Sequence, residues 1–276
     1  MGRDNDLEGK VISPSQPPQL IQLTTSPLPL CPQTFALTGG ASGIGLATAR
    51  ILYARGANIA IADIDPAALA AASTALQATD ARTLLTNLDV ADRGAVTAWI
   101  ASVVAKFGRL HGAANCAGVI GQHHGTRAVE DLEDDQWDLI IGVNLSGMMA
   151  SLRAQLKAME GPGSIVCVSS VQGTMGFAKH AAYAASKHGI LGLVRCAAKE
   201  VGGRGIRVNA VTPGSIETPL MHKRNALEGV DMTITPTPIN RMGTAEECAN
   251  LIAWLLSDES SFVSGATYAV DGGWAC

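Results

Sequence analysis

The sequence predicts an α/β fold: one doubly wound parallel sheet of about seven strands, with helices on both faces, in a single domain. From residue 35 onward, short β-rich apolar runs alternate strictly with alanine-rich helical patterns, which is typical of parallel β-α units. The strand candidates are continuously apolar, as strands buried on both faces are. The 276 residues, 47% of them hydrophobic, are enough for one large domain with a sizeable core.

The expected elements follow in β-α order along the chain. Strands are expected at 35–38, 58–62, 83–88, 110–115, 164–169, 206–211 and 267–270. Helices are expected at 43–55, 66–77, 92–107, 133–159, 180–201 and 244–256. Asp92 and Thr244 are the expected N-caps, and Glu247 three residues after Thr244 completes a capping box. Gly56 and Gly108 are the expected helix ends.

Residues 12–34 differ from the rest of the chain. They include no charged residue and six of the twelve prolines, a density that prevents both a helix and a central strand. We therefore expect residues 1–34 to be an N-terminal extension with a poorly ordered, Pro-rich insertion at 12–34. The single folded domain then covers 35–276, and its proline-containing region 217–240 is expected to be a mobile lid.

The composition excludes several classes of partner. The net charge of −4 provides no basic surface for nucleic acid or acidic membranes. No uninterrupted apolar run approaches the ~18 residues that span a bilayer, and the N-terminus lacks the apolar stretch of a signal peptide, so a cytoplasmic protein is expected. The six cysteines form no CxxC pair and show no metal-ligand spacing, which predicts free thiols and no metal site.

A glycine-rich turn follows the first expected strand and opens the first helix. It reads Gly39-Gly40-Ala41-Ser42-Gly43-Ile44-Gly45. Its glycines allow a tight turn, close approach to a pyrophosphate and close helix–strand packing, and the helix N-terminus presents N–H groups to the phosphates. A turn that serves packing alone is the alternative. The Rossmann-like context of strand, turn, helix and a later acidic residue favours a dinucleotide.

The acidic residue is Asp63, at the end of the second expected strand. A carboxylate there accepts hydrogen bonds from ribose hydroxyls and repels a 2′-phosphate. No Lys or Arg lies in the turn or just after Asp63, so NAD(H) is favoured over NADP(H). Helix capping is the alternative role, which Asp65 fills equally well.

Further motifs, in order and at matching spacing, make residues 35–276 resemble the short-chain dehydrogenase/reductase family. They are the Gly-x-x-x-Gly-x-Gly turn, Leu88-Asp89-Val90, Asn115-Cys116-Ala117-Gly118, Val143-Asn144-Leu145, Ser169-Ser170, Tyr183-Ala184-Ala185-Ser186-Lys187, Pro213-Gly214-Ser215-Ile216-Glu217-Thr218 and Asp271-Gly272-Gly273. One departure is Cys116, where the family has a second asparagine. Because the first asparagine and the Ala-Gly backbone are kept, we expect little loss.

The resemblance implies an oxidoreductase that transfers a hydride between NAD(H) and a secondary alcohol or ketone. The implied catalytic residues are Ser170, Tyr183, Lys187 and Asn144. The implied cofactor contacts are Gly39, Ser42, Gly43, Ile44, Gly45, Asp63, Ile64, Asp89, Val90, Asn115, Ala117, Gly118, Tyr183, Lys187, Pro213, Gly214, Ile216 and Thr218. The family's long helices pair across subunits, which implies a homodimer or homotetramer.

Tyr183 and Lys187 are four residues apart in an expected helix and so share one face. Free tyrosine, with a pKa of about 10, is a poor base at neutral pH. An ammonium about 4–5 Å away favours the phenolate by roughly 3–4 kcal/mol, so we expect Lys187 to lower the pKa of Tyr183 and make it the general acid/base. Ser170 would bind the substrate oxygen, since strand alternation and the family register favour it over Ser169.

Other interpretations remain open at this point. A non-redox isomerase or dehydratase of the same family could use the same Tyr–Lys pair. A cofactor-binding module without turnover is another alternative, because Leu7-Glu8-Gly9-Lys10-Val11 resembles the family's entry into its first strand, and the 12–34 insertion would interrupt that strand. The insertion is either a looped-out excursion or a translated intron. Histidines 123, 124, 180 and 222 could contact substrate, but exposed loop positions are expected for them.

Overall fold

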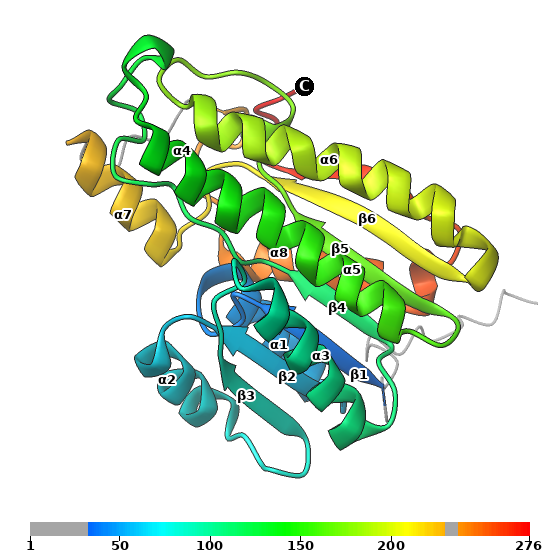
Figure 1. The fold of residues 1–276 in the computed structure, drawn as a ribbon. Coiled ribbons are helices and arrows are strands. Elements are labelled where there is room, and N and C mark those ends of the chain that lie inside the picture. Colours follow the sequence, from blue (N-terminus) through cyan, green and yellow to red (C-terminus); the bar gives the residue numbers. More distant parts are fainter. Residues whose placement is uncertain (1–32, 230–236) are drawn as a thin grey trace, which may run out of the picture.

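The computed structural model describes residues 33–229 and 237–276. Seven parallel strands form one sheet in the order β3-β2-β1-β4-β5-β6-β7. Helices α3, α5 and α6 lie in front of this sheet in Figure 1, and α8 lies behind it. The predicted class, a doubly wound parallel α/β domain, is confirmed.

The strand and helix bounds follow the predicted order closely. The strands are β1 (Thr34–Thr38), β2 (Asn58–Asp63), β3 (Thr83–Asn87), β4 (Gly112–Asn115), β5 (Gly163–Val168), β6 (Ile206–Pro213) and β7 (Thr267–Val270). The helices are α1 (Gly43–Ala54), α2 (Pro66–Leu76), α3 (Arg93–Phe107), α4 (Asp134–Ile141), α5 (Met148–Ala158), α6 (Ala181–Val201), α7 (Pro219–Glu228) and α8 (Ala245–Leu256).

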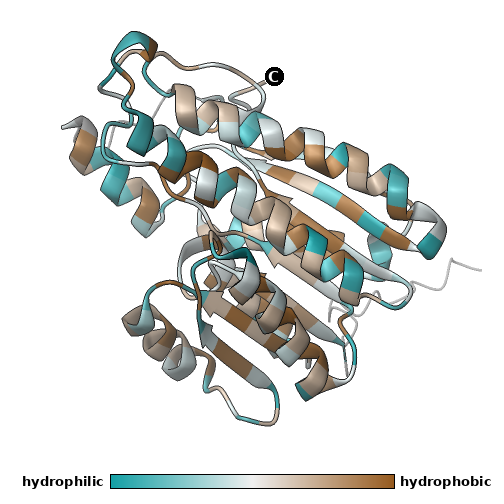
Figure 2. Ribbon diagram, viewed as in Figure 1, coloured by the Kyte–Doolittle hydropathy of each residue, from teal (hydrophilic) through white to brown (hydrophobic). Residues whose placement is uncertain are grey.

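Side chains of each strand alternate between two hydrophobic cores. Phe35 and Leu37 of β1 pack with buried residues of α1, α2 and α8. Ala36, between them, belongs to the other core, with buried residues of α3, α5 and α6. Because both faces are covered, the strands are mainly hydrophobic in Figure 2, and the continuous apolar runs in the sequence have this origin.

The predicted helix ends are confirmed by their hydrogen bonds and backbone angles. The Asp92 carboxylate accepts from two N–H groups at the start of α3, and Asp65 does the same for α2 at 2.8 and 3.1 Å. Gly56 and Gly108 follow α1 and α3 with φ of +95° and +80°, angles that favour glycine.

The helix expected over 133–159 is interrupted. A π-helical turn, Gly142–Gly147, joins α4 to α5. Asn144 in this turn is fully buried and bonds the backbone of Val119. Periodicity alone does not show such a widened turn, which is often found at functional sites. The combined stretch 134–158 has the length and hydropathy of a membrane span, and half of its most apolar window is buried inside the domain, as in a core helix.

The predictions for two segments of the chain are only partly confirmed or stay untested. Thr34, assigned to the N-terminal extension, is the first residue of β1, fully buried, and its N–H donates to His111. The rest of the 12–34 insertion up to residue 32 lies outside the described residues. Part of the expected lid, 217–240, is the helix α7, capped by the Thr218 side chain. Residues 230–236 are not described, so the lid's motion stays a prediction.

Candidate active site

A cleft lies along the carboxyl ends of the parallel strands. It consists of a cavity of about 890 Å³ and a second of about 790 Å³, both including space open to solvent. The two share Ile44, Cys116, Gly118, Val168, Thr218 and Leu220. The first cavity adjoins the ends of β1 and β4, where the order of strands reverses direction, the usual ligand position in open α/β sheets.

The glycine turn after β1 leaves almost no room for side chains. A Cβ on Gly39 would lie 2.7 Å from the Ala117 nitrogen, and Gly39 has a φ of +61°. A Cβ on Gly45 would collide with the Gly39 carbonyl oxygen. The side chain of Ser42, at the N-cap of α1, makes no capping hydrogen bond. The backbone N–H groups at the start of α1 can therefore bind phosphate oxygens.

Asp63 lies at the end of β2 and lines the first cavity. One carboxylate oxygen accepts from the Ala41 N–H at 3.1 Å and the other from the Asp65 N–H at 3.2 Å. These two bonds fix the carboxylate beside the glycine turn. Each oxygen keeps a lone pair for a further donor.

The structure brings most of the predicted cofactor residues together. The first cavity is lined by Gly39, Ser42, Gly43, Ile44, Gly45, Asp63, Ile64, Asp89, Val90, Ala117, Gly118 and Thr218. The second is lined by Tyr183, Lys187, Pro213, Gly214 and Ile216. Asn115 lines neither: its buried side chain exchanges two 2.8 Å hydrogen bonds with Gln155. Asn115 therefore ties β4 to α5 and does not reach the cleft.

Ser170, Tyr183 and Lys187 meet in the second cavity. The Ser170 hydroxyl accepts from the Gln172 N–H at 3.1 Å and keeps its proton for a further acceptor. The Lys187 ammonium lies 5.5 Å from the centre of the Tyr183 ring and donates to the Val168 carbonyl at 3.1 Å. Ser169 also touches the cavity, but its hydroxyl donates to the Lys187 carbonyl at 2.8 Å. This leaves Ser170 as the serine available to a substrate.

The pKa of Tyr183 differs from the sequence-based expectation. Burial raises the pKa of Tyr183 to about 12, and the neighbouring Ser170 hydroxyl opposes this rise. Burial also lowers the pKa of Lys187 to about 8. The expected lowering of the tyrosine pKa by Lys187 is not found, because Lys187 is not among the causes of the shift and desolvation is the largest of them. The protein's own groups keep Tyr183 protonated at neutral pH.

Asn144 lies next to this group. It accepts from the Val119 N–H at 2.8 Å and donates to the Val119 carbonyl at 2.9 Å and to Ser186 at 3.1 Å. A Cβ on Gly118 would lie 3.3 Å from the Asn144 side-chain oxygen and 3.4 Å from the Lys187 nitrogen. The Asn144 side chain thus shapes the wall beside Lys187.

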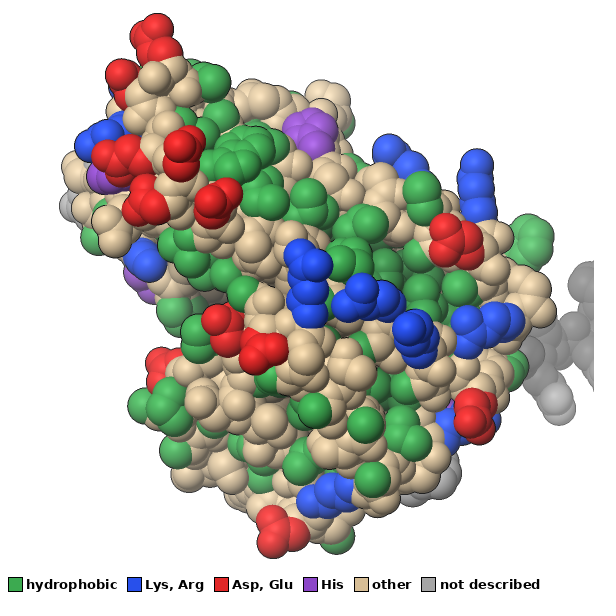
Figure 3. All heavy atoms as spheres, in the orientation of Figure 1, with side chains coloured by type: hydrophobic (Ala, Val, Ile, Leu, Met, Phe, Trp, Pro, Cys, Tyr) green, Lys and Arg blue, Asp and Glu red, His purple; other side chains and the backbone are tan. Residues whose placement is uncertain are grey.

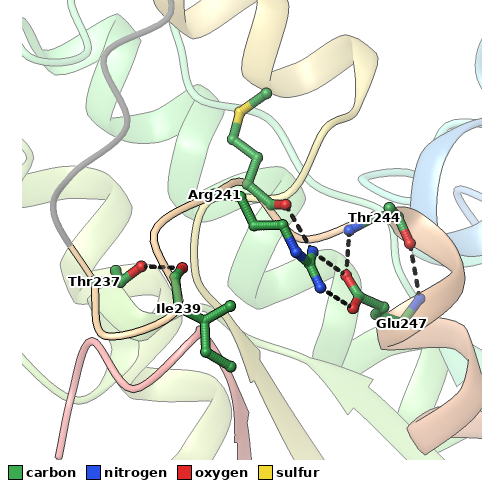
Figure 4. A network of polar contacts seen from close by, with 6 residues as sticks. Thr237, Ile239, Arg241, Thr244 and Glu247 are labelled. Carbon is green, nitrogen blue, oxygen red and sulfur yellow. Dashed lines mark hydrogen bonds and ion pairs between the residues drawn. The ribbon is translucent and has the colours of Figure 1, made fainter.

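The turn after β6 is held from outside the cleft. Gly243 pairs with Ile216 in a parallel bridge and exchanges backbone hydrogen bonds with both neighbours of Ile216. Figure 4 shows how this segment is fixed. Arg241 forms a two-pronged ion pair with Glu247 at 2.6 and 2.8 Å, and Glu247 also accepts from the Thr244 N–H. The capping box therefore also positions the cleft wall. The buried Ser215 hydroxyl in this turn has no hydrogen-bond partner among the described residues, which fits a turn that binds a ligand.

Sequence reasoning missed part of the second cavity. Its walls include Gln172, Arg224 and Trp274, which no local pattern identifies. His124, expected to be exposed, is only 5% exposed and lines the same cavity. The burial of His124 results from tertiary contacts, so the local sequence does not predict it. His123, its neighbour, instead pairs with Glu133 at 3.0 Å.

In the described ranges, 33–229 and 237–276, Cys116, Cys167, Cys196, Cys248 and Cys276 are free thiols, as predicted; Cys31 lies outside those ranges. Burial raises the pKa of both Cys116 and Cys167 to about 12, so both are uncharged. Within these ranges, no group of three His, Cys, Asp or Glu could hold a metal ion.

Known proteins share this architecture. A family model described as enoyl-(acyl carrier protein) reductase matches residues 39–275. The short-chain dehydrogenase/reductase ABA4 of Pyricularia oryzae is 51% identical over 251 residues, which cover 90% of this chain and 93% of that protein. Levodione reductase of Leifsonia aquatica is 37% identical (86% and 92% covered), and cyclohexanol dehydrogenase of Acinetobacter 36% (86% and 92%). The crystal structure of levodione reductase superposes with a TM-score of 0.81 at 36% identity, covering 88% of this chain and 97% of that one.

Proposed function

The chain belongs to the short-chain dehydrogenase/reductase family, and on that premise we propose that it oxidises a secondary alcohol, or reduces the ketone, with NAD(H). The observation that carries the proposal is the meeting of Ser170, Tyr183 and Lys187 in a cavity continuous with the glycine-turn cleft. The name of the relative cyclohexanol dehydrogenase supports a cyclic alcohol as the substrate.

The residues of the glycine-turn cleft fit a dinucleotide. Its glycines leave the space that side chains would fill, and Asp63 is fixed where ribose hydroxyls can donate to it. Among its described lining residues none is Lys or Arg, so a 2′-phosphate would meet only the carboxylate. This supports NAD(H) over NADP(H).

The mechanism assigns one task to each side chain. A bound nicotinamide cofactor supplies the carbon that takes up or gives the hydride and, when oxidised, a positive charge that favours the Tyr183 phenolate. In ketone reduction, protonated Tyr183 donates its proton to the substrate oxygen, and in alcohol oxidation it takes that proton back. Ser170 donates a hydrogen bond to the same oxygen and holds it in place. The Lys187 ammonium favours the phenolate form, and Asn144 maintains the wall beside it.

Turnover assays with one tyrosine variant test this proposal. Absorbance at 340 nm is followed with NAD⁺ or NADP⁺ and a panel of cyclic and acyclic secondary alcohols. Tyr183→Phe should reduce turnover to background while the affinity for NAD⁺ stays within about 3-fold. Tyr53→Phe is the matched control, because Tyr53 stacks on Arg82 outside the cleft and should keep full activity. Activity surviving in Tyr183→Phe would contradict the mechanism, and conversion without a change at 340 nm would favour the non-redox alternative.

A homodimer or homotetramer is part of the proposal. Trp137 and Leu139 of α4 are 39% and 45% exposed. Figure 3 shows hydrophobic side chains gathered on the face formed by α4, α5 and α6, beside a row of Lys and Arg. Such a face is suited to a second copy of the chain. Light scattering after gel filtration tests this, and a monomeric mass would refute it.

A further inference from the structure

His124 is a buried imidazole on the wall of the substrate cavity for which the proposed mechanism has no use. It is 5% exposed and lines the same cavity as Ser170 and Tyr183. Its ring packs against the Tyr183 ring in a T-shaped arrangement, with 5.1 Å between ring centres and 83° between planes. It thus lies within one small molecule's width of the reacting group.

The ring nitrogens of His124 make no hydrogen bond or ion pair with the residues that the structure describes. Neither nitrogen is among the fully buried, unpartnered polar atoms of those residues, so both keep some accessible surface although the residue as a whole is buried. Because His124 lines the cavity of Ser170 and Tyr183, a polar group of a bound substrate can supply the missing hydrogen bond.

Neighbouring groups hold the imidazole in place and keep it neutral. The His180 ring lies 4.0 Å from it, centre to centre, and His180 is itself oriented by the side-chain amide of Gln172. Burial, followed by the charges of His180 and Arg224, lowers the pKa of His124 to about 3. Neutral imidazole has one N–H donor and one acceptor nitrogen, which suit an uncharged oxygen.

We propose that His124 is a substrate-binding residue that hydrogen-bonds a second oxygen, hydroxyl or carbonyl, of the alcohol or ketone. The inference rests on the proposed function. The proposed mechanism assigns the reacting oxygen to Ser170 and Tyr183, which line the same cavity, so His124 is left for another polar group of the same molecule. Ile120, Met221 and Trp274 supply apolar walls around it. The substrate class is therefore a compact, mainly apolar ring with two oxygens.

The test compares ketones that differ only in the second oxygen. Reduction of cyclohexanone and of 2-, 3- and 4-hydroxycyclohexanone by NADH is followed at 340 nm. Wild type should prefer at least one hydroxyketone by about 10-fold in kcat/KM, the effect of one hydrogen bond. His124→Phe keeps the ring stack and should bring that ratio to about 1. His124→Gln should keep most of the preference, because its amide can replace the imidazole. His123→Gln is the matched control.

The possible outcomes separate this inference from the proposed function. If His124→Phe slows both kinds of ketone equally, His124 only supports the Tyr183 ring and the inference is overturned. It is overturned as well if wild type reduces cyclohexanone but prefers no hydroxyketone. If NADH binds but no ketone of the panel is reduced, the proposed function itself fails. Thermal unfolding of each variant shows that a lost preference does not come from a lost fold.

Discussion

Replacing Gly39 by alanine tests whether the glycine turn is shaped for a cofactor or only for a tight bend. In the structure Gly39 has a φ of +61°, and an added Cβ would lie 2.7 and 2.8 Å from the Ala117 nitrogen and Cα. The left-handed conformation costs alanine about 1 kcal/mol. The contact with backbone atoms adds about 1–3 kcal/mol, because neither side can rotate away. The expected total is about 2–4 kcal/mol of unfolding free energy.

Gly108 provides a matched control. It also has a positive φ, +80°, but a Cβ there would have no neighbour within 4 Å. Gly108→Ala should therefore lose only about 1 kcal/mol, or about 3 °C in melting temperature, and bind NAD⁺ normally. Gly39→Ala should lose about 6–12 °C and bind NAD⁺ at least about 10-fold more weakly, since the turn and the end of β4 must separate. Urea unfolding and calorimetric titration measure both quantities. Equal losses in the two variants, with unchanged NAD⁺ affinity, would refute the reasoning.

Three further predictions concern charged residues. Lys187→Met should abolish activity yet raise stability by about 2 kcal/mol at pH 7, because burial lowers the pKa of Lys187 from 10.5 to about 8. Between pH 8 and 10.5 the unfolded chain binds more protons than the folded protein, so wild-type stability rises with pH and the stability advantage of Lys187→Met shrinks. A stability difference between the two proteins that stays constant over this pH range in urea titrations would contradict this. Asp63→Ser should raise the NADP⁺/NAD⁺ ratio of kcat/KM about 30-fold by removing about 2 kcal/mol of repulsion, while Asp65→Ser, which keeps a capping residue, leaves it unchanged. Glu247→Ala should lower the melting temperature at pH 7 but not near pH 2. The reason is that the hydrogen bond from Arg241 lowers the pKa of Glu247 to about 2. The contribution of the Glu247 carboxylate to folding stability is therefore complete above the ordinary pKa of 4.5 and is lost as the pH falls toward 2.

Local patterns were sufficient for most elements of the fold. Asp92 and Thr244 start helices, and Gly56 and Gly108 follow helix ends, because these signals act within a few residues of the chain. The helix α7 could have been predicted from the same kind of local signal. Thr218 and Pro219 form an N-cap and first helical position, and a glycine follows the helix. The proline content of the region concealed that signal.

Other features depend on contacts that no local pattern contains. The π-helical turn follows from Asn144 reaching the backbone of Val119, 25 residues away. Asn115 fits its motif, yet the structure turns its side chain toward Gln155 and away from the cleft. In both cases the position of the asparagine side chain is set by its hydrogen-bond partner, which belongs to a distant segment of the chain.

The sequence by itself determined the order of strands and helices, the glycine turn and the four-residue spacing of Tyr183 and Lys187, because periodicity and spacing are local properties. Only the tertiary structure decided how those groups are solvated. Packing of α6 against the sheet buries Lys187, desolvation keeps Tyr183 protonated, and the loop after β4 places His124 in the substrate cavity. Burial is set by elements that are distant in the chain, so pKa values and unpartnered groups appear only once those elements are assembled.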